Sequence, residues 1–348
     1  MEKVKRVKLA VIGTTINGEK GYLPFDELAA KSPFKDVAFV IAGDIHSKPF
    51  DVSKFKCRVE YQEPKDQERF AISSIIGWRT PRRRPAAWLR AIELAPDFIL
   101  SVDDDNIPAP DYFATWYRVL TEPAAKKVTA ARFEMKAPWH NYLASADAPF
   151  EIHPRGFPHP FRAKTETALE ESGPHAPEKI ALWQGISLGD PDMDAMARLT
   201  WPQRTPLNVI REKNYVLENV WSPYNMQNTV YAPALFGLPI LWPFAGRFDD
   251  IYASFAFQRL MFNRGLLAHV GDPVNRQDRG GRDTLRGDFL EEIDGYHQSH
   301  DVWEEIHAIQ AREPTQFLDR LIQGKHPAIQ KHREFFEAYR SDIGKILK

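Results

Sequence analysis

Three short apolar runs place the strongest constraint on the fold of this chain. They occupy residues 9–13, 37–42 and 97–102, and each leads directly into a loop of small and polar residues. The runs are continuously apolar instead of alternating, which is typical of strands that are covered on both faces. Strands of that kind form parallel sheets that are joined by crossover helices. The sequence therefore predicts an α/β fold in which residues 1 to about 135 form one half of a doubly wound sheet.

An aspartate triplet, Asp103, Asp104 and Asp105, directly follows the third run. Side chains alternate along an extended segment, so Asp103 and Asp105 should point the same way. Two carboxylates that close repel each other unless a cation offsets their charge. Mg²⁺ and Mn²⁺ prefer such oxygen ligands and keep coordination sites open for phosphate groups. The triplet predicts a metal-held diphosphate at a strand end, where open α/β sheets bind ligands. The alternative is a solvated acidic turn, for which Asn106 and Pro108 are suitable residues.

The charge balance excludes a global attraction to nucleic acid or to an anionic membrane. The 348 residues include 46 basic and 47 acidic side chains, and the formal net charge is -1. A net charge this small gives no long-range field that could gather a charged polymer. A local basic run, Arg79, Arg82, Arg83 and Arg84, is the exception. It is interpreted as a solvated loop or, alternatively, as a contact with substrate phosphate groups.

Cysteine usage and hydropathy indicate the compartment. The single cysteine, Cys57, excludes an intramolecular disulfide and is typical of a reducing compartment. No long uncharged apolar stretch occurs in the sequence. We therefore expect a cytoplasmic protein that has no membrane partner.

Helical periodicity appears at residues 24–30, 67–77 and 86–94, and again from residue 289 to the end. The C-terminal stripes recur at three and four residues and break at 324–327, which predicts several helices that pack on the domain or on a second subunit. The middle, residues 138–206, is rich in Pro, His and Gly and has little periodicity, so it is read as a functional loop or lid, or else as disordered. Its scattered aromatic residues favour an ordered segment that faces a ligand: Trp139, Phe150, Phe157, Phe161 and Trp183.

Two further acidic sets could orient or deprotonate a hydroxyl group. They are Asp190, Asp192 and Asp194 in one segment and Asp249 with Asp250 in another. The alternative for each is a turn or a helix cap, and Asp250 in particular could cap the apolar run that follows it.

Two arginines, Arg155 and Arg162, flank a proline-rich segment, and an arginine near a diphosphate can bind it bidentately. The alternative is that both are ordinary surface residues. Histidines with regular zinc spacing, a Walker phosphate loop, a convincing G-x-G-x-x-G and a G-x-S-x-G elbow are all absent from the sequence. Their absence disfavours kinase, dinucleotide-binding and hydrolase functions.

Several of these stretches together resemble a known family. They are 41–44 with Ser47 and Lys48, 101–105, 155–158 with Arg162, 182–183, 191–195 and 246–253, and they occur in the same order over about residues 9 to 260. In this order they resemble the reversibly glycosylated polypeptides, which are the UDP-arabinopyranose mutase family, and more distantly the STELLO-type glycosyltransferases.

That resemblance implies a GT-A-like mixed sheet flanked by helices, a UDP-sugar and Mn²⁺ or Mg²⁺. It implies that Asp103 and Asp105 contact the metal, that Arg162 stands at the family's modified arginine, and that Asp249 and Asp250 face the sugar and the acceptor. Further contacts to the nucleotide sugar are implied for Thr14, Asp44, Asp103, Asp104, Arg155, Asp192, Asp194 and Arg247. The family's downstream histidine has no clear match, because His269 lies close but Asn275 takes the aligned place.

The sequence thus predicts a catalytic domain at residues 1–287 and a helical extension at 288–348, through which a homo-oligomer could form. The leading hypothesis is a metal-dependent glycosyltransferase with a UDP-sugar donor and an unidentified acceptor. A mutase that interconverts ring forms of a UDP-pentose is the first alternative, and a non-catalytic nucleotide-sugar-binding protein is the second. A nucleic acid acceptor is a minor variant, with residues 82–84 as its contacts.

Overall fold

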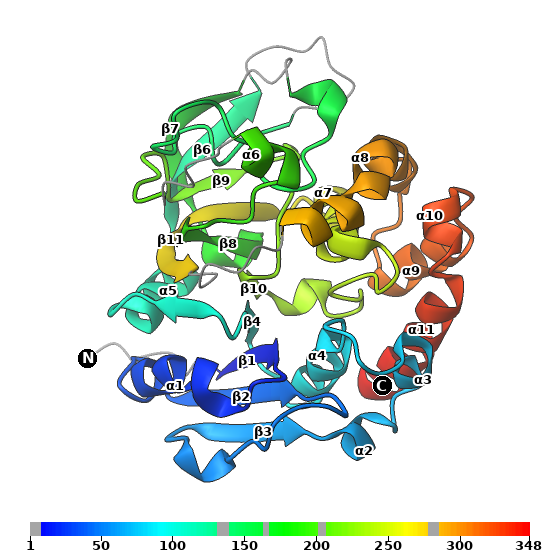
Figure 1. Cartoon of the computed structure of the whole chain (residues 1–348). Coiled ribbons are helices and arrows are strands. Elements are labelled where there is room, and N and C mark those ends of the chain that lie inside the picture. Colours follow the sequence, from blue (N-terminus) through cyan, green and yellow to red (C-terminus); the bar gives the residue numbers. More distant parts are fainter. Residues whose placement is uncertain (1–7, 131–138, 163–166, 201–206, 278–284) are drawn as a thin grey trace.

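The computed structural model describes residues 8–130, 139–162, 167–200, 207–277 and 285–348 (Figure 1). In this part of the chain an eleven-stranded sheet has the order β3-β2-β1-β4-β10-β8-β11-β9-β6-β7, and β5 pairs with β11. The strands are β1 (Lys8–Thr14), β2 (Asp36–Ala42), β3 (Arg58–Gln62), β4 (Phe98–Val102), β5 (Asn106–Pro108), β6 (Ala124–Ala130), β7 (Thr167–His175), β8 (Ile180–Gly189), β9 (Tyr215–Leu217), β10 (Asn228–Tyr231) and β11 (Leu267–Gln277).

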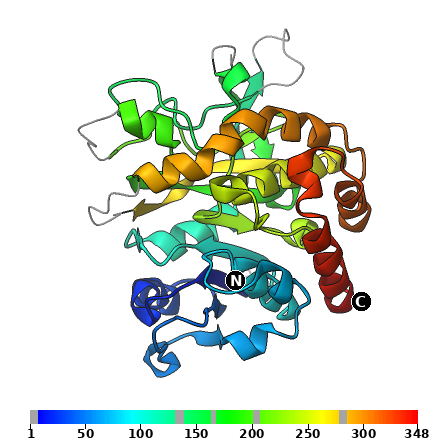
Figure 2. The ribbon, with the colours of Figure 1, turned by 45° about the vertical axis from the view of Figure 1, so that its right-hand side comes forward.

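Helices flank this sheet and continue to the C-terminal end of the chain (Figures 1 and 2). They are α1 (Leu23–Ala30), α2 (Pro64–Gln67), α3 (Ile72–Ile76), α4 (Arg84–Glu93), α5 (Tyr112–Thr121), α6 (Ala195–Thr200), α7 (Asp249–Arg264), α8 (Leu285–His307), α9 (Pro314–Ile322), α10 (Pro327–Gln330) and α11 (Arg333–Ile346). The fold class predicted from the sequence, a mixed α/β sheet flanked by helices with a helical C-terminal part, is confirmed. No helix in the described part of the chain combines the length and the hydropathy that crossing a bilayer requires.

The three apolar runs form β1, β2 and β4, and all three strands are parallel, as predicted. Strand β1 pairs with β2 on one side and with β4 on the other, so the chain changes direction across the sheet at β1. Ligands of open α/β sheets bind outside the carboxyl ends of the strands at such a switch point. The residues after β1 and β4 therefore meet at the position where a ligand is expected.

The two faces of the sheet carry separate apolar cores. In β1, Leu9 and Val11 belong to a core with α1 and α5, whereas Ala10 and Ile12 belong to a core with α4, α7 and the C-terminal helices. This alternation follows from the period of two along a strand. Because both faces are covered, the strand has no solvated side, which explains its continuously apolar sequence.

The resemblance implied a mixed sheet, but the individual strands of its antiparallel half were not predicted from the sequence. Strand β10 runs antiparallel to both β4 and β8, which makes the sheet mixed. Strand β8 lies inside the middle segment that was read as irregular, and nine of its ten residues are buried. Its composition of Gly, Ser and Gln among apolar residues gave no clear period.

The aromatic residues of the middle segment face the core instead of a ligand. Trp139 packs against Phe161, Trp221 and Trp303, with ring centroids 5.5, 5.9 and 5.7 Å apart. Phe150 is the exception at 38% exposure. The described residues of this segment are ordered, and two of them, Arg155 and Asp192, line a pocket at the strand ends. The aromatic residues from which a ligand-facing segment was predicted do not line that pocket.

Of the residues 67–77 that were predicted as one helix, only 72–76 form an interior helix, α3, because α2 ends at Gln67. The backbone N–H of Ile72 at the start of α3 donates to the carboxylate of Asp342 on α11, 3.1 Å away. A partner 270 residues away in the sequence therefore satisfies a helix-end donor, which local periodicity cannot reveal.

The C-terminal helices pack on the chain itself. The predicted break at 324–327 separates α9 from α10, and α11 lies beside α3 and α4 (Figures 1 and 2). The Trp88 indole N–H of α4 donates to the Tyr339 hydroxyl at 3.0 Å, and that hydroxyl lies 2.9 Å from the Leu238 carbonyl oxygen. Helix α8 begins at Leu285, so it crosses the predicted domain boundary at residue 287.

We expect Phe336→Ala to destabilise the whole protein by about 3–5 kcal/mol, because it empties a fully buried position in the shared core. Urea unfolding, followed by tryptophan fluorescence and by circular dichroism, should show one transition that shifts with both probes. Phe150→Ala, which changes a partly exposed phenylalanine, should leave the midpoint nearly unchanged. A separate early transition confined to the helical signal would contradict a single cooperative unit.

Candidate active site

Two adjoining pockets lie at the carboxyl ends of β1, β2 and β4. The first, called the β2 pocket, is lined by Asp44 and its neighbours after β2 and has a volume of about 280 Å³. The second, called the triplet pocket, is lined by Asp103, Asp104 and Asp105 and has a volume of about 410 Å³. They share the lining residues Thr14, Pro81 and Asp104, and the two adjoining pockets are together called the cleft. The triplet pocket alone is within the range of about 300–1,000 Å³ that is common for small-molecule sites.

The β2 pocket is built around the Asp44 carboxylate, which holds two loops together. It accepts hydrogen bonds from the backbone N–H groups of Ile45, Arg79 and Thr80 at 2.6, 2.9 and 3.1 Å. Burial raises the pKa of the Asp44 carboxyl, but these hydrogen bonds outweigh it and the net shift is downward. Asp44, predicted as a ligand contact, thus shapes the pocket through the backbone of its neighbours.

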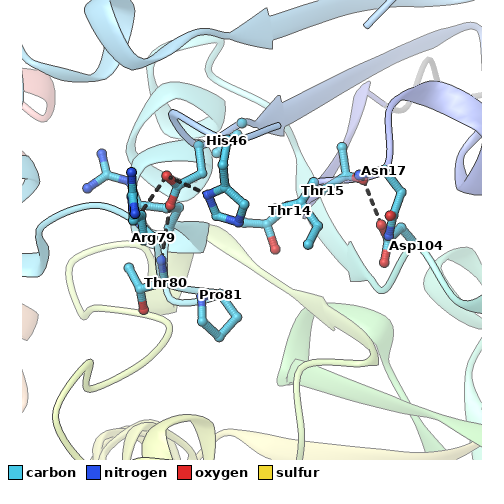
Figure 3. Close-up of a pocket in the computed structure, with 13 residues that line it drawn as sticks. Thr14, Thr15, Asn17, His46, Arg79, Thr80, Pro81 and Asp104 are labelled. Carbon is cyan, nitrogen blue, oxygen red and sulfur yellow. Dashed lines mark hydrogen bonds and ion pairs between the residues drawn. The ribbon is translucent and has the colours of Figure 1, made fainter. Parts of the chain in front are cut away.

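Asp104 faces the start of the loop after β1. Its carboxylate accepts a hydrogen bond of 2.6 Å from the Thr15 hydroxyl, and Figure 3 shows the two side chains pointing toward each other. The ends of β1 and β4 are thereby joined directly. Thr14, another predicted contact, lines both pockets at this junction.

Asp103 and Asp105 line the triplet pocket and are each held by a different element. Arg84, at the start of α4, forms an ion pair with Asp103 and donates to the Ser101 hydroxyl at 3.0 Å. The Gln277 amide, at the end of β11, donates to Asp105 at 3.2 Å. These contacts anchor the triplet on both sides, and the Asp105 side chain is exposed. The metal site and the solvated turn therefore both stay predictions.

The triplet pocket carries an excess of negative charge. Its lining includes four arginines and eight carboxylates, the latter being Asp103, Asp104, Asp105, Asp192, Asp249, Asp250, Asp288 and Glu291. A diphosphate would be repelled by this lining unless a cation accompanied it. Carboxylate oxygens are the donors that Mg²⁺ and Mn²⁺ prefer, so the residues fit such an ion.

The triplet would supply only part of a coordination sphere. Within the described residues, the group of three side chains whose ligand atoms lie within 4.8 Å of one another is His300, Asp301 and Glu304 on α8. The triplet would thus provide one or two ligands and the substrate phosphates others, which is the usual arrangement for Mg²⁺.

Neither candidate for the family's downstream histidine reaches this position. His269 and Asn275 are buried on β11 and do not line the triplet pocket, and the Asn275 amide donates to Asn106. Gln277, two residues beyond Asn275, is the residue of β11 that contacts the triplet, through Asp105.

Arg155 stands between two carboxylates on the opposite wall. Its guanidinium donates to Asp192 at 2.6 and 2.9 Å and to Asp250 at 3.0 and 3.1 Å. The next residue, Gly156, has a φ of 84°, and a Cβ there would collide with Ile251 of α7. The Arg-Gly dipeptide therefore lets the loop approach α7 closely enough for Arg155 to reach Asp250.

Asp250 is not the helix cap that was considered as an alternative. The N-cap of α7 is Phe248, and Asp250 lies in the first turn with its carboxylate in the pocket. Burial, together with the charges of Asp249 and Asp192, raises the pKa of the Asp250 carboxyl to about 7, although Arg155 opposes the shift. This is the pKa range that suits proton transfer near neutral pH.

The far wall combines predicted and unpredicted residues. Arg247, a predicted contact, donates to Glu292 of α8 at 2.8 Å and pairs with Asp288 at 3.2 Å. Arg82 lies 3.3 Å from Asp249 and donates to Glu291 at 2.8 Å. The residues of α8 were not predicted as site residues, because only the apolar positions of that helix were used to predict its role.

Arg162 and Asp194 lie elsewhere. They form an ion pair with each other, and neither lines the two pockets. Asp194 is fully buried and also accepts a hydrogen bond from the backbone N–H of Ala197 at 2.7 Å. The roles predicted for these two residues stay predictions.

The basic run is solvated only at Arg79, which is exposed and lines the β2 pocket. Arg83 and Arg84 are 1% and 4% exposed. Arg83 donates to Gln67 at 2.7 and 2.9 Å and to the Gly77 carbonyl at 3.0 Å, so it holds the turn that precedes α4. Arg82 and Arg84 line the triplet pocket, and the phosphate contacts of the second interpretation stay a prediction.

No protein-family model and no curated protein matches this chain. Among solved structures, glucosyl-3-phosphoglycerate synthase from Mycobacterium tuberculosis in complex with phosphoglyceric acid is 11% identical, with a TM-score of 0.42 over 87% of this chain and 81% of that one. The same enzyme in complex with Mn²⁺, uridine diphosphate and glucosyl-3-phosphoglycerate is 13% identical, with a TM-score of 0.39 and coverages of 87% and 81%. A mannosyltransferase from Pyrobaculum calidifontis in complex with GDP-Man and Mn²⁺ is 12% identical, with a TM-score of 0.37 and coverages of 99% and 74%. Similarity at this level concerns the path of the chain and decides nothing about its chemistry.

Proposed function

We propose that this protein is a metal-dependent glycosyltransferase that uses a UDP-sugar as donor. The observation that carries the proposal is the pair of adjoining pockets, in which the aspartate triplet stands between the β2 pocket and a wall of carboxylates and arginines. A nucleoside in the β2 pocket would place its diphosphate at the triplet and its sugar against Asp249 and Asp250. The site, rather than the similarity to solved structures, supports this assignment.

The chain's own residues prepare the diphosphate position. Asp103 and Asp105 would hold Mn²⁺ or Mg²⁺, which would neutralise the charge that develops on the departing UDP. Arg84 fixes Asp103, and Gln277 fixes Asp105, so neither carboxylate has to be reoriented when the nucleotide binds. Asp104 and Thr15 tie the two strand ends together beneath this position.

Asp249 and Asp250 stand where an acceptor hydroxyl would approach the sugar. Of the two, Asp250 has a pKa of about 7, so its carboxylate can take a proton from the attacking hydroxyl near neutral pH. Arg155 holds Asp250 through two hydrogen bonds and leaves part of its accepting capacity to the cleft.

The transferase is preferred over the mutase because Arg162, the residue that supported the mutase, does not line the cleft. The resemblance to the reversibly glycosylated polypeptides stays a prediction. A non-catalytic binding protein would not require a carboxylate with a pKa near neutrality at the sugar position.

UDP should bind in the presence of Mn²⁺ and lose at least about tenfold in affinity in Asp105→Ala, because the carboxylate is a proposed metal ligand. Isothermal titration calorimetry with and without the metal measures both effects. Asp301→Ala, which removes an exposed carboxylate of the α8 cluster, serves as the matched control and should bind UDP as the unaltered protein does. Equal affinity with Mn²⁺, with chelator and in Asp105→Ala would exclude the proposed metal site.

The rate of UDP release from a UDP-sugar should rise with pH and reach half of its plateau near pH 7. The reason is that Asp250 must be ionised to accept a proton, and its pKa of about 7 sets the midpoint. Asp250→Asn should lower the plateau rate by about 10²–10⁴-fold and abolish this dependence. A coupled assay for UDP between pH 5.5 and 8.5 gives the profile. A flat profile, or an Asp250→Asn protein that keeps its rate, would remove Asp250 from the reaction.

A further inference from the structure

Gln227 has a buried amide without a hydrogen-bond partner in the wall of the triplet pocket. The residue is 4% exposed, and both its Nε2 and its Oε1 lack a partner among the described residues. Buried polar groups in folded proteins are as a rule paired, and each exception calls for an explanation. A ligand in the pocket can supply the missing donor and the missing acceptor together.

The position of Gln227 places this amide beside the proposed diphosphate site. Strand β10 begins at the next residue, Asn228, which lies opposite Val102 in the antiparallel pairing with β4. Gln227 therefore lies opposite Asp103, where β10 begins and β4 ends. Its backbone N–H donates to the side-chain oxygen of Asn225 at 3.1 Å, which fixes the turn that carries it.

A second neutral amide flanks the triplet on its other side. Gln277 donates from Nε2 to Asp105, and its buried Oε1 has no partner among the described residues. The part of the ligand that is bonded to the diphosphate would thus contact two uncharged amides, those of Gln227 and Gln277. An amide presents a donor and an acceptor, and a hydroxyl group can satisfy both, because it also accepts and donates.

Charge in the same pocket disfavours an acidic ligand. Each arginine of the described lining lies within ion-pair distance of a carboxylate: Arg82 with Asp249 and Glu291, Arg84 with Asp103, Arg155 with Asp192 and Asp250, and Arg247 with Asp192, Asp288 and Glu292. A carboxylate on the ligand would have to displace one of these partners. An uncharged polyhydroxyl group requires no such exchange.

We propose that Gln227 selects the transferred sugar by binding its hydroxyl groups, and that this sugar is an uncharged hexose or pentose rather than a uronic acid. The inference rests on the proposed function, because it takes the diphosphate to lie at the triplet. Gln227 is a specificity residue in this scheme, and it takes no part in metal binding or proton transfer.

Calorimetry in the presence of Mn²⁺ tests the proposal with UDP and with matched pairs of UDP-sugars. The pairs are UDP-glucose with UDP-glucuronate and UDP-galactose with UDP-galacturonate, which differ only at the sixth carbon. The uncharged member of at least one pair should bind about tenfold more tightly than its uronate. Gln227→Leu should lower the affinity for that UDP-sugar by about tenfold or more and change the affinity for UDP by no more than about twofold. Gln323→Leu, an exposed glutamine at the end of α9, is the control and should change neither value.

A thermodynamic cycle separates recognition from a structural effect. The monodeoxy analogue that lacks the recognised hydroxyl should bind the unaltered protein more weakly, and Gln227→Leu should then add no further loss. Additive losses, an equal loss for UDP itself, or uronates that bind as well as uncharged sugars would overturn the proposal. If Gln227→Leu does not fold, the affinities of the unaltered protein for the matched pairs and for the monodeoxy analogue still test the proposal. Failure of the unaltered protein to bind UDP with Mn²⁺ would instead reject the proposed function, and this inference with it.

Discussion

The cleft depends on one buried ionic contact, the bracketing of Arg155 by Asp192 and Asp250. The three side chains come from two loops and from α7, so this contact joins three segments of the pocket wall. A buried guanidinium is stable only when its charge is matched and its donors are used, and here two carboxylates meet both conditions. Removal of either carboxylate would leave part of the buried charge of Arg155 uncompensated. The wall that faces the triplet therefore holds its shape without a bound ligand.

The same contact explains how an acidic pocket can serve an anionic substrate. The arginines are already committed to carboxylates, so they organise the walls instead of attracting phosphate. The remaining negative charge is concentrated at the triplet, where it can hold a divalent cation. Nucleotide binding and cation binding should be coupled as a result, because each reduces the electrostatic cost of the other. The raised pKa of Asp250 also reduces the negative charge of the pocket, because this carboxylate is partly protonated near neutral pH.

Prediction from the sequence was most successful where the local residue pattern of a segment reflects its tertiary contacts. The runs at β1, β2 and β4 are apolar because both faces of each strand are covered, so their parallel pairing and the triplet at the end of β4 could be predicted. Strand β8 and the late start of α3 could not be predicted, since both depend on partners far away in the chain. In the site, charged residues near a strand end were identified readily. Gln227, Gln277 and Glu291 were missed, because an isolated amide or a helical carboxylate looks the same in sequence whether or not it faces a cavity.

Helix α8 gives the cleft an outer wall that does not originate in the sheet. Its first turns supply Asp288 and Glu291 to the pocket, and further along it supplies Trp303 to the core. Gly295 lets the helix approach Phe248 so closely that a Cβ would collide with the aromatic ring, which fixes α8 against the start of α7. The floor of the cleft and its rim are thus encoded in segments almost 200 residues apart. Divergence in the rim could alter which molecules enter while the strand ends that form the floor remain untouched, so relatives that share the same floor need not share the same acceptor.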